Sequence, residues 1–132
     1  SDIIYKLLVA GMEAAHQAGG QHKELIDRMN LIHGDSITIL PHMQADVVLV
    51  DPMHPPRRKS ALAKAEMRAI RDIVGIDEDQ RSLIETALAM AANRVVLKWP
   101  AKAAPLGGLR PASHQIIGKS MRYDVFMTRR KE

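Results

Sequence analysis

The pattern of apolar and polar positions in the first third of the chain predicts helices and one strand. Apolar side chains recur at the spacing of one helix face over residues 3–12, and the pair Gly19-Gly20 ends that segment. A second, shorter helix is expected over residues 23–28. The brief apolar run at 30–33 is stopped by a glycine, as at the end of a strand. Residues 36–43 predict a short helix or turn.

Two apolar runs in the middle of the chain predict buried strands. Residues 46–50 form a continuous run rich in β-branched side chains, as expected for a strand buried on both faces. Residues 94–98 form a second run of this kind. Between them, the spacing of apolar residues predicts a helix over 61–75 and another that begins near residue 77 and has an apolar face extending to Ala91.

The last third predicts a loop and a strand pair. Residues 100–111 are rich in Ala, Pro and Gly and indicate a loop, whereas 114–117 and 123–127 predict two strands joined through 118–122. Strands that alternate with helices favour an α/β layered domain with a mainly parallel sheet and a C-terminal antiparallel strand pair. In such sheets ligands bind at the carboxyl ends of the strands.

Length and composition exclude several classes of protein. The chain has 132 residues, of which 46% are hydrophobic and 26% charged, and this size suits one globular domain. It contains no cysteine, which excludes disulfide scaffolds, thiolate metal sites and cysteine nucleophiles. Since no apolar run reaches the roughly 18 residues of a membrane span, and the first residues lack the features of a signal peptide, we expect a cytoplasmic protein without a membrane partner.

Charge is distributed unevenly along the sequence. The formal net charge is only +4, but residues 1–50 hold three basic and six acidic side chains, whereas residues 94–132 hold nine basic and two acidic ones. A modest overall charge can therefore conceal a basic face, which is the surface that a polyanion would meet. A solvated surface with scattered Lys and Arg side chains is an equally good interpretation of the same counts.

The pair Asp51-Pro52 directly follows the first buried strand. Pro52 removes a backbone donor and fixes φ, so it ends the strand and holds the next residues rigidly. A carboxylate held at this position can accept hydrogen bonds from an amino group, which suits an enzyme that orients the exocyclic amine of a base. An aspartate that merely caps the following turn explains the same spacing.

A second polar group, Gly34-Asp35-Ser36, follows the strand expected at 30–33. Its two polar side chains could receive an adenine amino group or a hydroxyl group. The alternative interpretation is that Asp35 caps the short helix that begins with the next residue.

Basic residues close to these motifs are candidate contacts for phosphate groups. Three of them follow Asp51 within one loop, and His54 in the same loop could stack on a base. Others lie near the C-terminus. The candidates are Arg57, Arg58, Lys59, Lys119 and Arg122. The six histidines show no metal-ligand spacing, so we expect no metal site.

Four segments of the sequence resemble one enzyme family. They are LIHGDS at 31–36, DPMHPPRRKSA at 51–61, RVVLKWP at 94–100 and GKSMRYDVF at 118–126. Together they are similar to the RsmJ (YhiQ) family, bacterial methyltransferases that use S-adenosylmethionine to methylate a guanine N2 of small-subunit ribosomal RNA. The resemblance extends from near residue 1 to about residue 128, and the motif that begins at Asp51 is its most specific part.

The resemblance implies a Rossmann-like class I methyltransferase fold and a set of site residues. Asp35, Ser36 and Asp51 match positions that contact the methyl donor, and Asp51 and Pro52 match the catalytic motif. Met53 and His54 continue that motif on the side of the RNA, although family members usually carry an aromatic residue in place of His54. The implied partner is ribosomal RNA or the small ribosomal subunit.

The resemblance also implies that part of the family's domain lies upstream of this sequence. The glycine-rich donor loop and the first two strands of the family have no counterpart in residues 1–132, which therefore match the C-terminal portion of a single methyltransferase domain. Two alternatives stay open: an amino-methyltransferase that acts on another nucleic-acid base, and a non-catalytic RNA-binding fragment. The sequence gives no indication of the oligomeric state.

Overall fold

The structure, a computed structural model, describes residues 1–52 and 79–128, which belong to two compact units. Of the described residues, 1–34 belong to the first unit, and 35–52 and 79–128 belong to the second. The helix predicted over 61–75 lies outside the described residues.

The first unit contains two consecutive helices, α1 (Asp2–Ala18) and α2 (Gly20–Ile26). They meet at Gly19 and Gly20, whose φ angles of 71° and 54° lie in the left-handed region that glycine adopts without strain. The prediction of two helices divided at this glycine pair is confirmed, although α2 begins earlier than expected. Neither helix contains a buried residue.

The prediction of a strand at 30–33 was wrong, because these residues form no regular secondary structure. A strand is stabilised by hydrogen bonds to a neighbouring strand, and the regular elements in the described part of the first unit are both helices. The segment is held by side chains instead. The ring of His33 stacks on Tyr5 with centroids 4.6 Å apart, and its Nε2 lies 3.2 Å from Oδ1 of Asp2.

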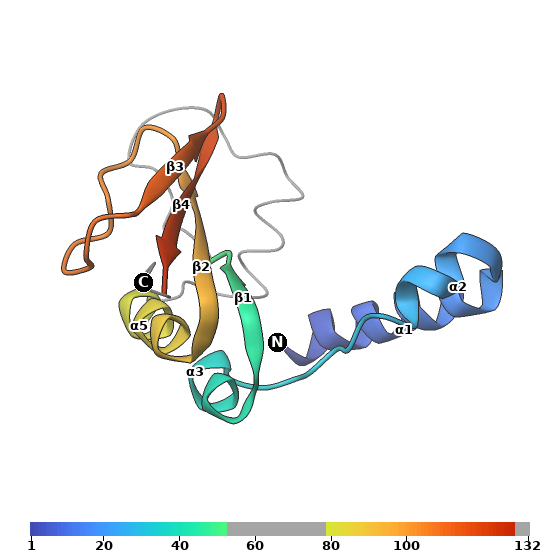
Figure 1. Cartoon of the computed structure of the whole chain (residues 1–132). Helices are drawn as coiled ribbons and strands as arrows, with labels where there is room; N and C mark the ends of the chain where they lie inside the picture. Colours follow the sequence, from blue (N-terminus) through green and yellow to red (C-terminus); the bar gives the residue numbers. More distant parts are fainter. Residues whose placement is uncertain (53–78, 129–132) are drawn as a thin grey trace. The chain divides into compact units, whose positions relative to one another are not determined.

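The second unit is built on a four-stranded sheet (Figure 1). Along the chain its described elements are α3 (Ser36–Ile39), η1 (Leu40–His42), β1 (Ala45–Val50), α5 (Gln80–Met90), β2 (Ala91–Pro100), β3 (His114–Ile117) and β4 (Met121–Met127). The strand order is β1-β2-β4-β3, with β1 parallel to β2 and the other two pairs antiparallel. The parallel pair and the C-terminal antiparallel pair both agree with the α/β fold predicted from the sequence.

The core of the second unit lies between the sheet and α5. Ile84 and Ala87 of the helix are fully buried, as is Val95 of β2, and Leu97 is 1% exposed. In β2 every second residue from Val95 to Trp99 is buried in this core, and Val96 is half-buried on the other face. Strand β2 is longer than predicted and begins directly where α5 ends. Ala91, which the sequence suggested for the helix face, is therefore the first residue of the strand and pairs with Ala45.

The loop between β2 and β3 packs against this core. Leu106 and Leu109 are partly buried against the core residues. Gly108 adopts a φ of 81°, and a Cβ atom at this position would overlap the guanidinium group of Arg81 on α5. The predicted loop is thus confirmed, and it is a packed part of the second unit.

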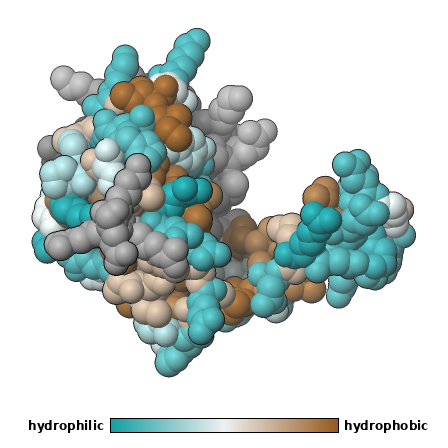
Figure 2. Space-filling model, viewed as in Figure 1, coloured by the Kyte–Doolittle hydropathy of each residue, from teal (hydrophilic) through white to brown (hydrophobic). Residues whose placement is uncertain are grey.

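The outer strand β3 is exposed along its whole length. Ile116 and Ile117 are 60% and 69% exposed, and Figure 2 shows hydrophobic surface in brown at the place of this strand.

Among the residues that the structure describes, no helix has both the length and the apolar character needed to cross a bilayer.

Candidate functional site

Asp51 lies where the sequence analysis placed it, at the carboxyl end of β1. Its side chain is 52% exposed, whereas Pro52 behind it is buried. The last paired residues of the parallel ladder are Val50 and Leu97, so the next residues along the two strands, Asp51 and Lys98, are neighbours. Because the buried proline fixes the chain that leaves the strand, the carboxylate is presented from a rigid part of the fold.

Asp51 forms an ion pair with Lys98. The Nζ atom of Lys98 donates a hydrogen bond to Oδ2 of Asp51 at 2.7 Å. This hydrogen bond, together with the charge of Asp51, raises the pKa of Lys98 above its usual value despite partial burial. Among the described residues, Oδ1 of Asp51 has no hydrogen-bond partner. One oxygen is therefore fixed and the other is available to a ligand.

Lys98 is not among the site residues predicted from the sequence. The sequence does contain evidence that Lys98 lies near Asp51, because each of them directly follows an apolar run that predicts a buried strand. If two such strands are neighbours and parallel, their carboxyl ends meet at the same edge of the sheet. The register that brings these two residues together is visible only in the folded chain.

An exposed row of side chains continues across the sheet from this ion pair. Lys98 pairs with Tyr123 of β4, and Tyr123 pairs with Ile116 of β3. Directly opposed residues in neighbouring strands point to the same face, so the four side chains from Asp51 to Ile116 share one face of the sheet. Tyr123 is 38% exposed and also helps to raise the pKa of Lys98.

Asp35 and Ser36 lie elsewhere in the second unit. The side chain of Asp35 accepts a hydrogen bond from the backbone N–H of Ile37 at 3.0 Å and so caps α3, which is the alternative left open by the sequence. Helix α3 and η1 lead through two residues into the amino end of β1, whereas Asp51 follows its carboxyl end (Figure 1). The structure does not bring the two predicted donor-binding motifs together.

The predicted RNA contacts fall into three groups. The residues next to Asp51, namely Met53, His54, Arg57, Arg58 and Lys59, lie outside the described residues. Lys119 is exposed in the turn between β3 and β4. Since Met121 pairs with Pro100 at the carboxyl end of β2, this turn is at the same end of the sheet as Asp51.

Arg122 is buried, contrary to its predicted role in RNA binding. It is 5% exposed, and its Nε donates to Oδ1 of Asp124 at 2.9 Å. Its Nη1 shares its two hydrogens among three carbonyl oxygens at 2.7 to 3.3 Å, those of Pro100 at the end of β2 and of Ala101 and Ala103 in the loop that follows. A guanidinium group held by these partners could reach a phosphate only by leaving them, so the geometry favours a structural role.

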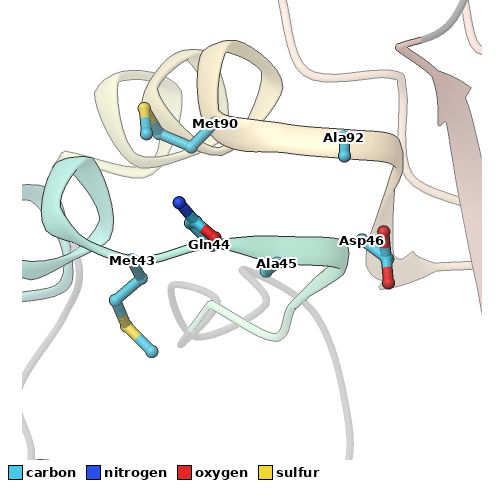
Figure 3. A pocket seen from close by; sticks show the side chains of 6 residues that line it. All are labelled: Met43, Gln44, Ala45, Asp46, Met90 and Ala92. Carbon is cyan, nitrogen blue, oxygen red and sulfur yellow. The ribbon is translucent and has the colours of Figure 1, made fainter.

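A shallow cavity of about 460 Å³ lies at the opposite end of the strands. Figure 3 shows the six side chains that line it: Met43, Gln44, Ala45, Asp46, Met90 and Ala92. These residues surround the amino ends of β1 and β2 and are far along the strands from Asp51. Within the described ranges, no three or more histidine and acidic side chains form a group that could hold a metal ion.

Comparison with known proteins decides which family this fold and this motif represent. A family model described as "Putative SAM-dependent methyltransferase" matches residues 1–128. The chain belongs to this family.

Curated relatives carry a more specific name. Proteins called "Ribosomal RNA small subunit methyltransferase J" from Brucella anthropi and Agrobacterium fabrum are 55% and 54% identical to this chain, over 96% and 91% of its length. A relative of the same name from Rhodopseudomonas palustris is 51% identical over 96% of the chain. The chain spans only 58–62% of the length of these three relatives.

A solved structure supports the same assignment of the fold. The crystal structure of a SAM-dependent methyltransferase from Neisseria gonorrhoeae matches this chain with a TM-score of 0.68 and 28% sequence identity. The match covers 94% of this chain and 51% of the other. The resemblance inferred from the four sequence motifs is therefore confirmed at the level of the family and the fold.

Proposed function

We propose that the protein containing this chain transfers a methyl group from S-adenosylmethionine to the exocyclic N2 of a guanine in small-subunit ribosomal RNA. The observation that carries this proposal is Asp51, a half-exposed carboxylate at the carboxyl end of a parallel strand, with one oxygen free of protein partners among the described residues. Membership of the methyltransferase family and the names of the curated relatives support it.

The residues of the chain fit the methyl donor by their chemistry. The exposed Asp35, Ser36 and Asp51 offer carboxylate and hydroxyl oxygens, which can accept hydrogen bonds from hydroxyl and amino groups. Only Asp51 of these three lies at the carboxyl end of a described strand. The donor contacts of Asp35 and Ser36 stay predictions from the family resemblance.

Asp51 acts mainly by orientation in this proposal. Bound S-adenosylmethionine supplies a methyl group whose carbon–sulfur bond breaks, leaving its electron pair on sulfur, as the lone pair of the guanine amine forms the carbon–nitrogen bond. The free Oδ1 of Asp51 accepts a hydrogen bond from that amine and so directs its lone pair at the methyl carbon. A strong base is not required, because the nitrogen loses its proton after transfer, to Asp51 or to water.

The RNA would approach the exposed end of the sheet that carries Asp51. Lys119 in the β3–β4 turn provides a positive charge at this end, and the basic residues 57–59 begin six positions after Asp51 in the sequence. We place the reaction in the cytoplasm, with ribosomal RNA or the small subunit as substrate.

The test is methyl transfer to small-subunit ribosomal RNA by the complete protein that contains this chain, with Asp51→Ala compared with Asp46→Ala. Asp46 is the matched control because it is an aspartate on the same strand at the opposite end. We expect Asp51→Ala to lower kcat by about 100-fold or more, since the amine is no longer oriented, and Asp46→Ala to leave it nearly unchanged.

Mass spectrometry of the digested RNA identifies the product and separates the alternatives. N2-methylguanosine is the expected nucleoside. Methylation of another base would show that the protein is a methyltransferase but that guanine N2 is not its target. RNA binding without methyl transfer by the wild-type protein would overturn the proposed enzyme in favour of a binding module.

A further inference from the structure

The ion pair between Asp51 and Lys98 indicates a role for a residue outside the predicted motifs. A carboxylate on a single-bond stem can rotate, and each rotation moves its two oxygens relative to a bound ligand. In this structure, Lys98 fixes Oδ2 at 2.7 Å and Oδ1 has no partner among the described residues. The lysine itself comes from β2, which is paired on both sides and contributes Leu97 to the core, so its stem starts from a rigid position.

We propose that Lys98 is a positioning residue, which holds the Asp51 carboxylate in the rotation that leaves Oδ1 to accept a hydrogen bond from the amine to be methylated. This inference rests on the proposed function of Asp51 and adds a second residue to the site. It gives the enzyme a way to orient the amine without the cost of ordering the carboxylate on each turnover.

The surroundings of Lys98 favour this role over that of an ordinary surface ion pair. The side chain of Lys98 is 34% exposed and that of Asp51 is 52% exposed, so the lysine is the more shielded partner of the pair. Tyr123 lies directly opposite Lys98 on β4 and limits the space into which the lysine can turn. The hydrogen bond to Asp51 is the main cause that raises the pKa of Lys98, so this contact favours the charged ammonium group.

A direct contact of Lys98 with an RNA phosphate is the competing role. The two roles differ in kinetics. A residue that only orients Asp51 affects kcat, whereas a lysine that binds phosphate contributes to RNA affinity and makes the effect of its removal depend on salt concentration.

The test is a double-mutant cycle in the complete protein, with methyl transfer to small-subunit ribosomal RNA as the assay. Its variants are Lys98→Met, Asp51→Asn and the pair together, with Lys102→Met as matched control, because Lys102 is an exposed lysine in the loop after β2. Lys98→Arg tests rescue by a second cation. Circular dichroism and thermal unfolding establish that each variant is folded.

We expect Lys98→Met to lower kcat by about 10- to 100-fold, with KM for RNA changed by less than about twofold at low and high salt. Lys98→Arg should retain most of the activity and Lys102→Met all of it. In the Asp51→Asn background, Lys98→Met should have little further effect, because a residue that acts through Asp51 cannot act when that carboxylate is gone.

Three results would overturn the inference: additive effects in the cycle, a salt-dependent rise in KM as the main effect, or the same activity in Lys98→Met and Lys102→Met. Failure of the proposed function has a different signature. In that case Asp51→Asn alone would retain wild-type activity, or the wild-type protein would transfer no methyl group to this RNA.

Discussion

Helices α1 and α5 both carry apolar residues at helical spacing, but only α5 buries them in the described structure. In α1, Leu7 is 63% exposed and none of its 17 residues is buried. In α5, which has 11 residues, Ile84 and Ala87 have no exposed surface because they lie on the sheet of the second unit. The space-filling view in Figure 2 shows hydrophobic surface on the first unit as well as on the second.

The difference in burial between α1 and α5 shows that helix formation and the burial of a helix face are separate questions, although one sequence pattern bears on both. An amphipathic pattern predicts that a helix forms, because apolar residues three and four apart share a face. It does not identify what covers that face. Most of the stability of a helix in a protein comes from tertiary packing, so α1 and α5 should respond very differently to the same kind of substitution.

The largest effect is expected where the second unit buries charge. Replacing Arg122 by Met leaves the buried carboxylate of Asp124 without its ionic partner and releases three loop carbonyls. We expect a loss of about 3–5 kcal/mol in the free energy of unfolding, measured with urea. Arg94→Met, at an exposed position of β2, is the control. If the two variants have the same free energy of unfolding, Arg122 does not have the structural role described here.

A smaller effect tests the comparison of the two units directly. Leu97→Ala empties a position in the core that is 1% exposed, and we expect a loss of about 2–5 kcal/mol. The same change at Leu7 of α1 removes an exposed side chain and should cost less than about 0.5 kcal/mol. If urea unfolding gives Leu7→Ala a cost close to that of Leu97→Ala, α1 is buried in solution and the contrast between the units disappears.

The smallest effect concerns polar contacts within the first unit. Lys23 donates a hydrogen bond to Asp27, and this bond, assisted by His16, lowers the pKa of Asp27 below its usual value of 3.8. A lowered pKa means that the contribution to stability is present above pH 3.8 and is lost as the pH falls through the folded value.

Thermal unfolding of Asp27→Asn against wild type checks this from neutral to acid pH. The wild type should be slightly more stable at pH 6, and the difference should vanish at the lowest pH because Asp27 is then neutral in both states of the protein. A difference that persists at the lowest pH would assign the effect to packing rather than to charge.

The elements that could be predicted from sequence are those whose pattern depends on burial along one segment. The residues between Asp46 and Asp51 and those between Arg94 and Lys98 are apolar without interruption, and both strands contribute side chains to the core. Asp51 could be placed at a strand end because Pro52 stops the ladder. The positions of the two strands and of Asp51 are local features and are found where the sequence indicated. The predicted burial of the first run on both faces was wrong, because Val47 and Leu49 of the edge strand β1 are 42% and 62% exposed.

The features that could not be predicted depend on pairing between distant segments. The contact of Lys98 with Asp51 joins residues 47 positions apart and requires the register of β1 on β2. The error at 30–33 has the same origin, because an apolar run becomes a strand only where a neighbouring strand is available. The pairing of Arg122 with Asp124 could have been predicted from sequence, since Asp124 is two residues further along β4 and hence on the same face.

Trp99 gives this chain a built-in optical probe. It is the only tryptophan in the chain, it is 8% exposed, and its indole Nε1 donates a hydrogen bond to the carbonyl oxygen of Ala104 at 2.9 Å. Tryptophan emission from residues 1–132 therefore originates at one junction, between the end of β2 and the loop that Arg122 holds. Fluorescence can follow the docking of that loop on the sheet without any added label.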